Sequence, residues 1–313
     1  MGTIGLIFPG QGSQSVGMGK DLYDASATAK AVFDAANDAL GFDVAQLCFD
    51  GPEEDLKLTT NTQPAIVATS IAALRMLQEQ VQFDAAYVAG HSLGEYSALV
   101  CAGAIDFADA VRTVRKRGQF MQEAVPVGVG TMAAIVGLDQ TDVEAVCADI
   151  NADDNVVTLA NINCPGQYVI SGHVKAVEAV IEAAKEKGAK RAIPLPVSAP
   201  FHCVLMQPAA NNLAPVLDAI TFNDLRVPLV NNAEADIVTS GADARQALVR
   251  QMYTSVRWEQ SVRVMLEQGV DTFIEVGPGK VLAGLMRRIE RKATCLSVNN
   301  LKTLEKTVQA LQG

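Results

Sequence analysis

The sequence predicts an α/β protein in which a mainly parallel sheet carries an inserted, ferredoxin-like βαββαβ unit. Apolar, strand-like runs at residues 4–8, 85–89 and 272–276 alternate with helical patterns, which is typical of a parallel α/β sheet. Between residues 128 and 197 the expected order is strand, helix, strand, strand, helix, strand, which is the ferredoxin-like order. A Gly-x-Ser-x-Gly motif after the second strand predicts a sharp turn from strand to helix.

The first strand, residues 4–8, ends in the turn-rich segment 9–14, which cannot continue a strand or a helix. The next strand leads into Gly90-His91-Ser92-Leu93-Gly94 and a helix over residues 95–100. Small residues beside the serine let the chain turn and expose the hydroxyl, and the helix amides face any charge on a substrate carbonyl oxygen. We expect acyl transfer through Ser92; the alternative is a glycine turn with an incidental serine.

The inserted unit has expected strands at residues 131–138, 156–162, 168–171 and 191–196, and helices at 142–150 and 174–187. Glycine and proline bound it at residues 126–130 and 194–196, as they do where a segment is inserted into a larger domain. We place the large domain at residues 1–127 and 198–313 and the small domain at residues 128–197. Further helices, the strand at 272–276 and a final helical stretch after residue 279 follow.

A chain of 313 residues, 49% of them apolar, can bury one large core or a large and a small one. Six scattered cysteines without a CxxC pair, and the lack of a leader-like start, favour free thiols in a reducing cytoplasm. No apolar run approaches the roughly 20 residues of a membrane helix. The net charge of −10 argues against a general nucleic-acid binder, since such proteins neutralise phosphates with Lys and Arg. We expect a monomer.

Ser92 needs a base, because a serine hydroxyl is a poor nucleophile until a neighbour accepts its proton. His91 adjoins the serine and is expected to point away from it, and His173 opens a helix of the insertion. His202 lies where the chain re-enters the large domain, on a loop that can face Ser92. We assign His202 as the base; the alternative is a histidine that only packs in a loop.

A triad also needs an acidic residue that orients the imidazole. Acidic residues between Ser92 and His202 are plentiful, but most belong to the inserted unit or to helix faces, and none stands out. The other arrangement is a dyad in which a backbone carbonyl orients the histidine and holds the correct tautomer.

A helical pattern over residues 106–123 has an apolar stripe of Phe107, Ala110, Val114 and Met121, and Arg117 falls on this stripe. A guanidinium on a buried face is costly unless it is paired, and its planar fork suits a carboxylate. Arg117 therefore forms either a structural ion pair or a site for an acyl group that carries its own carboxylate.

These features together resemble the malonyl-CoA:acyl-carrier-protein transacylases, the discrete loading enzymes of bacterial fatty acid synthesis. The resemblance covers nearly the whole chain and rests on motifs in a fixed order. They are Phe8-Pro9-Gly10-Gln11-Gly12-Ser13-Gln14, the nucleophile motif at residues 90–96, Asn161-Ile162-Asn163 with Pro165-Gly166-Gln167, Gln251 with Val256-Arg257-Trp258, and Glu275-Val276-Gly277-Pro278-Gly279. It implies a hydrolase-like α/β large domain that carries the ferredoxin-like insertion.

The resemblance also implies roles for single residues. Ser92 is the nucleophile and His202 the base, and the backbone amides of Gln11 and Leu93 form an oxyanion hole. The main-chain carbonyl region of Gln251 orients the histidine, which would explain the missing acidic residue.

Four further residues are implied to bind substrate. Arg117 matches the arginine that holds the malonyl carboxylate, and Met121 and Asn163 match positions along the acyl and pantetheine path. Phe201, before the histidine, goes with malonyl rather than methylmalonyl choice in related multidomain synthases. Ser255 departs from the family, in which proline is common at this position, so the rigidity of the loop near Gln251 is an open point.

The implied reaction moves a malonyl group from malonyl-CoA to the phosphopantetheine thiol of acyl carrier protein, through a malonyl ester on Ser92, without a metal or redox cofactor. One alternative is a serine thioesterase or esterase, in which water takes the acyl group. Others are a polyketide-type acyltransferase with broader acyl choice and a catalytically silent interaction protein. Basic residues that could meet an acidic carrier are Arg112, Arg115, Lys116, Lys187, Lys190 and Arg191.

Overall fold

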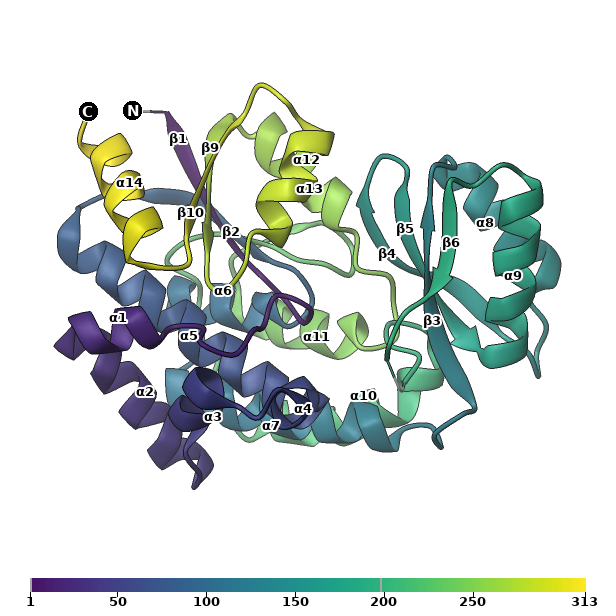
Figure 1. Ribbon diagram of the computed structural model, residues 1–313, viewed down its shortest axis with the longest axis horizontal. Coiled ribbons are helices and arrows are strands. Elements are labelled where there is room, and N and C mark those ends of the chain that lie inside the picture. The colour runs from purple at the N-terminus through teal and green to yellow at the C-terminus, as the bar shows by residue number, and fades with distance from the viewer. Residues whose placement is uncertain (1, 198) are drawn as a thin grey trace.

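The computed structural model describes residues 2–197 and 199–313, and it has two sheets (Figure 1). Ser198, at which we place the return to the large domain, lies outside the described residues. The larger sheet has the strand order β10-β9-β1-β2-β7-β8, and only β8 is antiparallel to its neighbour. Its strands are β1 (Thr3–Phe8), β2 (Ala85–Gly90), β7 (Leu229–Val230), β8 (Ile237–Val238), β9 (Val270–Val276) and β10 (Thr294–Val298).

The large sheet is buried on both faces. Successive side chains of a strand point to opposite sides, so each strand contributes to a separate core cluster on each face. In β1, Leu6 and Phe8 pack into the main core cluster, whereas Ile7 packs into a second cluster around Trp258. The helices outside the insertion, some of which pack on the sheet and some on other helices, are α1 (Lys20–Ala25), α2 (Ala27–Leu40), α3 (Val44–Asp50), α4 (Glu53–Lys57), α5 (Thr59–Gln80), α6 (Gly94–Ala102), α7 (Phe107–Glu123), the 3₁₀ turn η1 (Val204–Met206), α10 (Gln207–Asp218), α11 (Gly241–Gln251), α12 (Trp258–Glu267), α13 (Val281–Ile289) and α14 (Leu301–Gln312). No helix among the described residues is both long and apolar enough to cross a membrane.

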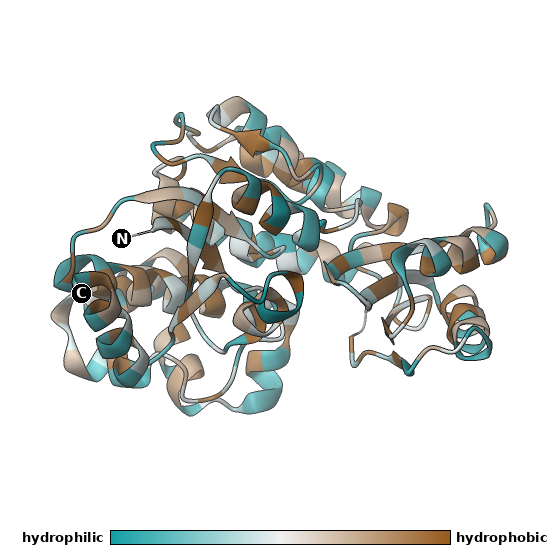
Figure 2. Cartoon of the chain, turned by 90° about the horizontal axis from the view of Figure 1, so that it is seen from above, coloured by the Kyte–Doolittle hydropathy of each residue, from teal (hydrophilic) through white to brown (hydrophobic). Residues whose placement is uncertain are grey.

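The expected insertion forms its own antiparallel sheet, which has the order β4-β5-β3-β6. It folds as β3 (Gly130–Val136), α8 (Gln140–Ile150), β4 (Val157–Cys164), β5 (Gln167–His173), α9 (Val174–Glu186) and β6 (Arg191–Pro194). Its core is separate: Ala133 and Ile135 of β3 face Val177 and Val180 of α9, whereas Met132 faces the large domain. Figures 1 and 2 show this smaller part beside the larger one, with its two helices on the outer side.

The final stretch after residue 279 is not purely helical, contrary to our expectation. The strand β10 lies between α13 and α14 and pairs with β9 at the edge of the sheet. Its sequence, Thr-Cys-Leu-Ser-Val, is short and its side chains are mostly half-buried, so it carries no strong apolar run. The strands β7 and β8 were also missed, since each is only two residues long.

Backbone hydrogen bonds join the small domain to the large one beside Gln251. The amide of Ile162 in β4 donates to the carbonyl of Val256 over 2.9 Å, and the amide of Val256 donates to the carbonyl of Ala160 over 2.8 Å. The hydroxyl of Ser255 donates to the carbonyl of Leu159 over 2.6 Å. The side chain of Ser255 thus holds this loop against β4.

Candidate active site

The Gly-x-Ser-x-Gly motif forms a sharp turn between β2 and α6. A Cβ atom on Gly90 would lie 1.9 Å from the carbonyl carbon of Gly94, and one on Gly94 would lie 2.1 Å from the carbonyl oxygen of Phe8. Glycine is therefore required at both positions. Ser92 between them has a φ of +50°, which is uncommon for a residue with a side chain and indicates strain that the surroundings must hold.

The turn brings Ser92 to His202, as the sequence predicts. The hydroxyl oxygen of Ser92 lies 2.7 Å from Nε2 of His202, and Nδ1 of His202 lies 2.8 Å from the backbone carbonyl oxygen of Gln251. Because a carbonyl only accepts, Nδ1 carries the proton and Nε2 is free to accept the proton of Ser92. The structure thus places Ser92, His202 and the backbone carbonyl of Gln251 in one hydrogen-bonded chain, which is the arrangement that a dyad would need.

The surroundings keep His202 neutral. The side chain is buried, and this burial, together with the positive charge of Arg117, lowers the pKa of His202 from 6.5 to about 3. The imidazole is therefore in its basic form at neutral pH. A substrate anion beside Arg117 would offset part of this positive field and so make His202 a stronger base.

Arg117 reaches the same hydroxyl. Its Nη2 donates to the hydroxyl oxygen of Ser92 and to Oε1 of Gln251, over 3.0 Å in each case, and its Nη1 donates to Oε1 of Gln63 over 2.9 Å. The side chain is only 1% exposed, yet every one of these acceptors is uncharged. Among the described residues its Nε has no hydrogen-bond partner. The structure therefore does not show the structural ion pair that the sequence left open.

Two backbone amides beside Ser92 are free to donate. Within the described residues, neither Gln11 nor Leu93 has a hydrogen-bond acceptor for its backbone N–H. The loop that carries Gln11 lies directly against the turn, since a Cβ atom on Gly10 would lie 2.3 Å from the carbonyl oxygen of His91. The side chain of Gln11 is held by Thr59 over 3.3 Å.

A cavity of about 130 Å³ opens next to the serine, between the two domains. Phe201 lines it, whereas Met121 and Asn163 do not. Met121 is buried in α7, where its sulfur accepts a hydrogen bond from Gln63, and Asn163 lies 2.8 Å from Nε2 of His91. The lining residues are Gln11, His91, Ser92, Met132, Asn161, Leu195, Val197, Phe201 and His202.

The other two histidines lie as expected. The side chain of His91 turns away from the serine to Asn163 and packs against Trp258. His173 caps α9, and its Nδ1 accepts from the backbone amide of Val156 over 2.9 Å. Among the described residues there is no group of three His, Cys, Asp or Glu side chains that could hold a metal ion.

Three polar residues of the site were missed from the sequence. Gln63 holds Arg117, Asn232 accepts from the backbone amide of Ser92 over 2.6 Å, and Glu95 accepts from Gln251 over 3.1 Å. Glu95 alone carried a signal, because an acidic residue directly after the serine motif occupies the first turn of a buried helix. Gln63 and Asn232 are ordinary amides far away in the chain, and no local pattern marks them.

Comparison with known proteins agrees with this geometry. Residues 6–309 match the family model described as the acyl transferase domain. The malonyl CoA-acyl carrier protein transacylase of Bacillus subtilis is 51% identical over 312 residues, which is 100% of this chain and 98% of that protein. The enzyme of the same name from Escherichia coli K12 is 52% identical over 299 residues, 96% of each chain.

Solved structures agree as well. An acyl carrier protein S-malonyltransferase from Vibrio cholerae has a TM-score of 0.95 and 48% identity, over 97% of this chain and 99% of that one. A malonyl-transacylase in complex with a type II PKS acyl-carrier protein has a TM-score of 0.96 and 47% identity, over 98% of this chain and 99% of that one. The chain belongs to the acyl transferase domain family, within its malonyl CoA-acyl carrier protein transacylases.

Proposed function

We propose that this chain transfers a malonyl group from malonyl-CoA to the phosphopantetheine thiol of an acyl carrier protein, through an ester on Ser92, and so supplies fatty acid synthesis. The observation that carries the proposal is the hydroxyl of Ser92, which lies 2.7 Å from the base His202 and 3.0 Å from the cation Arg117. The contact of Ser92 with His202 supports acyl transfer in general. The contact with Arg117 supports the transfer of an acyl group that carries a carboxylate. The curated relatives carry the name of this activity.

In the first half of the reaction, Ser92 attacks the thioester carbonyl of malonyl-CoA while its proton passes to Nε2 of His202. The oxyanion that forms accepts hydrogen bonds from the backbone amides of Gln11 and Leu93. The carbon–sulfur bond then breaks, and His202 returns the proton to the departing thiolate, which leaves as CoA. The malonyl ester remains on Ser92.

The second half reverses these steps with another thiol. The phosphopantetheine thiol of the carrier gives its proton to His202 and attacks the ester carbonyl of Ser92. The carbon–oxygen bond breaks, and Ser92 regains its proton from His202. Every step uses side chains, backbone amides and the two substrates, so we propose that no metal or redox cofactor takes part.

Arg117 would select the acyl group. It has only uncharged partners in the free site, so a malonyl carboxylate brings the first anion that its guanidinium can bind directly. The same anion raises the basicity of His202 by offsetting the positive field of Arg117. An acetyl group gains neither effect. We propose that Phe201 lines the path along which the acyl and pantetheine groups enter, and that Met121 and Asn163 shape this path indirectly, through Gln63 and His91.

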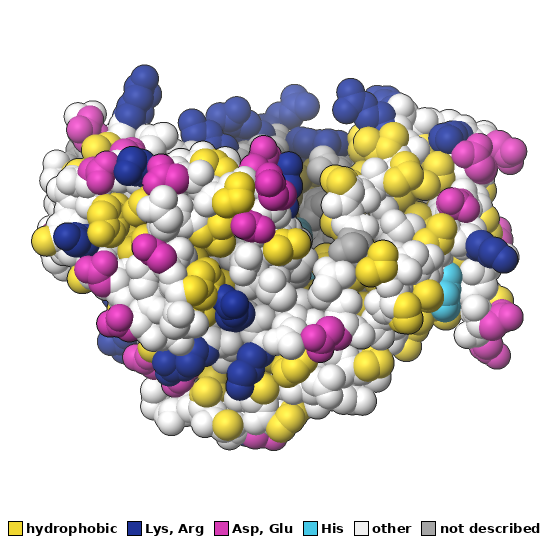
Figure 3. Space-filling view, turned by 60° about the horizontal axis from the view of Figure 1, so that its bottom comes forward, with side chains coloured by type: hydrophobic (Ala, Val, Ile, Leu, Met, Phe, Trp, Pro, Cys, Tyr) yellow, Lys and Arg dark blue, Asp and Glu magenta, His cyan; other side chains and the backbone are white. Residues whose placement is uncertain are grey.

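The carrier must approach the hollow between the two domains, which Figure 3 shows from below with Lys and Arg side chains gathered along its far rim. Carrier proteins of this kind are acidic, and the net charge of −10 of this chain makes a local basic surface necessary. Of the candidates predicted from the sequence, Arg112 and Lys187 already pair with Asp109 and Asp142.

All six cysteines are free, which fits the proposed cytoplasmic location.

Loading of a carrier protein tests the proposal. The wild-type chain is mixed with malonyl-CoA and a holo acyl carrier protein, and intact mass spectrometry follows the carrier. We expect the carrier to gain one malonyl group with the wild-type chain and none with Ser92→Ala, whose folding is checked by its thermal transition. If malonate is released to water faster than the carrier is loaded, the chain is instead a thioesterase.

A further inference from the structure

Glu95 is a buried carboxylate that the reaction as described does not use. It lies in the first turn of α6, three residues after Ser92, and none of its surface is exposed. A buried carboxylate is costly unless its oxygens are satisfied, and among the described residues Glu95 forms no ion pair. Arg117 lies near, but its nitrogens bind Gln63, Gln251 and Ser92 instead.

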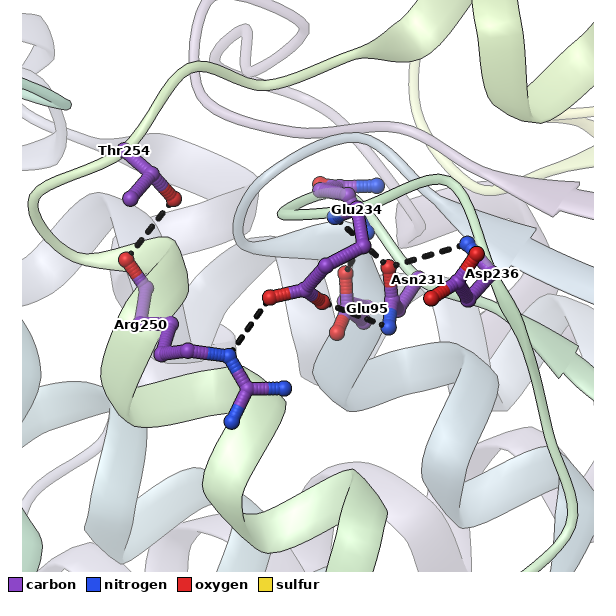
Figure 4. Close-up of polar contacts among 7 residues, drawn as sticks. Glu95, Asn231, Glu234, Asp236, Arg250 and Thr254 are labelled. Atoms are coloured by element: carbon purple, nitrogen blue, oxygen red, sulfur yellow. Dashed lines mark hydrogen bonds and ion pairs between the residues drawn. The ribbon is translucent and has the colours of Figure 1, made fainter.

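A single oxygen of Glu95 makes all of its hydrogen bonds. Oε2 accepts from the backbone amide of Asn232 over 2.9 Å and from Nε2 of Gln251 over 3.1 Å. Oε1 is buried and has no partner among the described residues. In Figure 4 Glu95 lies beside Glu234 and Asn231, and the ion pair of Glu234 is made with Arg250, not with a group of the active site.

Through Gln251, this oxygen acts on His202 and Arg117. An amide side chain fits its site in two orientations, but a carboxylate only accepts and a guanidinium only donates. Glu95 and the backbone carbonyl of Ser92 therefore share the NH₂ end of Gln251, over 3.1 Å and 3.0 Å, and the carbonyl end is left to accept from Arg117 over 3.0 Å. The backbone carbonyl of the same residue accepts from His202. In the reversed orientation, the NH₂ group of Gln251 would face the N–H groups of Arg117, and its carbonyl oxygen would face Oε2 of Glu95.

Through Asn232, the same oxygen acts on the strained turn. The backbone amide of Asn232 binds Glu95, while its side chain donates to the carbonyl of Gly90 over 2.8 Å and accepts from the amide of Ser92 over 2.6 Å. These bonds hold both sides of a serine whose φ is +50°. Glu95 thus connects the residue that orients the base with the residue that holds the nucleophile.

We propose that Glu95 is a positioning residue for malonyl transfer: its Oε2, as a hydrogen-bond acceptor at this place, fixes Gln251 and Asn232 and through them His202, Arg117 and Ser92. The proposal rests on the proposed function. It assigns the effect to the position of an acceptor oxygen and not to the negative charge. Two conservative variants separate these causes: one keeps the acceptor oxygen in place and removes the charge, and the other keeps the carboxyl group and moves the oxygen.

Glu95→Gln keeps an acceptor oxygen at the same reach but can carry no charge, and Glu95→Asp keeps the ionisable carboxyl group but withdraws the oxygen by one methylene group. We expect Glu95→Gln to acylate Ser92 with malonyl-CoA within about threefold of the wild-type single-turnover rate. Glu95→Asp should be slower by about 10-fold to 100-fold, a part of the 10²–10⁴ that a placed base contributes. Rates are counted per active site from the amplitude of acylation, so unfolded protein does not enter.

Glu275 is the matched control for the loss of a buried carboxylate. It is also buried, but its oxygens accept from the backbone amides of Leu282 and Ala283 at the start of α13 and touch no residue of the site. Glu275→Asp should lower the melting temperature and leave the rate per active site unchanged.

Three results would overturn the positioning role. The first is a low acylation rate for Glu95→Gln together with a high rate for Glu95→Asp, which would assign the effect to the charge. The second is an equal loss of rate in both variants. The third is an unchanged rate in both variants, which would leave Glu95 a purely structural role. Failure of the proposed function is visible separately, since the wild-type chain would then form no malonyl ester on Ser92.

Discussion

At the scale of single residues, the site combines the neutral imidazole of His202 with Arg117, whose partners among the described residues are all uncharged. Both side chains lie within hydrogen-bond distance of the Ser92 hydroxyl. Both are buried, so solvent screens their electrostatic interactions only weakly. The sequence predicted Ser92, His202 and Arg117, because a turn motif, the shortage of histidines and a charge on an apolar stripe each leave a local mark. It could not predict Gln63 or Asn232, whose importance comes from contacts between distant parts of the chain.

The pH dependence of acylation follows from the lowered pKa of His202. A base with a pKa of about 3 stays unprotonated down to pH 5.5. At malonyl-CoA concentrations well below saturation, where the rate reports the free site, we expect the single-turnover rate of Ser92 malonylation at pH 5.5 to be within about twofold of the rate at pH 7.5. An imidazole with the ordinary pKa near 6.5 would lose about tenfold over this range. A stopped-flow profile with an inflection near pH 6.5 would contradict the stated environment of His202.

At the scale of elements, the turn between β2 and α6 depends on close backbone contacts that only glycine permits. The strands and helices around it were predicted from apolar periodicity, and the βαββαβ order is confirmed by the small sheet. The strands β7, β8 and β10 escaped prediction because they are short or lie at the sheet edge. They are placed by pairing with distant strands and not by their own sequence.

Two glycine substitutions compare a close contact with open space. Gly90→Ala forces a Cβ atom to within 1.9 Å of backbone, so we expect a loss of at least about 3 kcal/mol in the free energy of unfolding. Gly284→Ala in α13 meets nothing within 4 Å and should stabilise by roughly 0.5–1 kcal/mol, because alanine favours a helix. Urea unfolding measures both. A Gly90→Ala protein as stable as the wild type would refute the tight turn.

At the scale of the whole molecule, residues from both the large part and the inserted part line the cavity beside Ser92. The large domain supplies Ser92, His202 and Arg117, while Met132 and Asn161 line the cavity from the small domain. The link between β4 and the Ser255–Val256 segment lies only a few residues after Gln251, so it ties the position of the small domain to the residue that orients the base.

The stability of the whole fold should depend on pH through Glu95. Burial raises the pKa of Glu95 from 4.5 to about 7, with Arg117 opposing and Glu234 adding to the shift. Between these values the native state binds a proton that the unfolded state has lost, so the contribution of Glu95 to stability falls as pH rises and is lost above about pH 7.

Glu95→Gln does not titrate. From pH 4.5 to 7 its free energy of unfolding should therefore rise by about 3 kcal/mol relative to the wild type, at about 1.36 kcal/mol per unit of pKa shift. Urea unfolding of both proteins across this range measures the difference. A constant difference would show that the carboxylate is not held with a raised pKa.

We predict that Ser92 accepts an acyl group whose free carboxylate is bound by Arg117. Single-turnover acylation, followed by intact mass with malonyl-CoA and with acetyl-CoA, tests it in the wild type and in Arg117→Ala. We expect the variant to lose about 100-fold or more with malonyl-CoA, in line with a buried charge-assisted pair worth roughly 3 kcal/mol, and to lose far less with acetyl-CoA, for which only the contacts of Arg117 with Ser92 and Gln251 are missing. Equal losses with both substrates would contradict the claim.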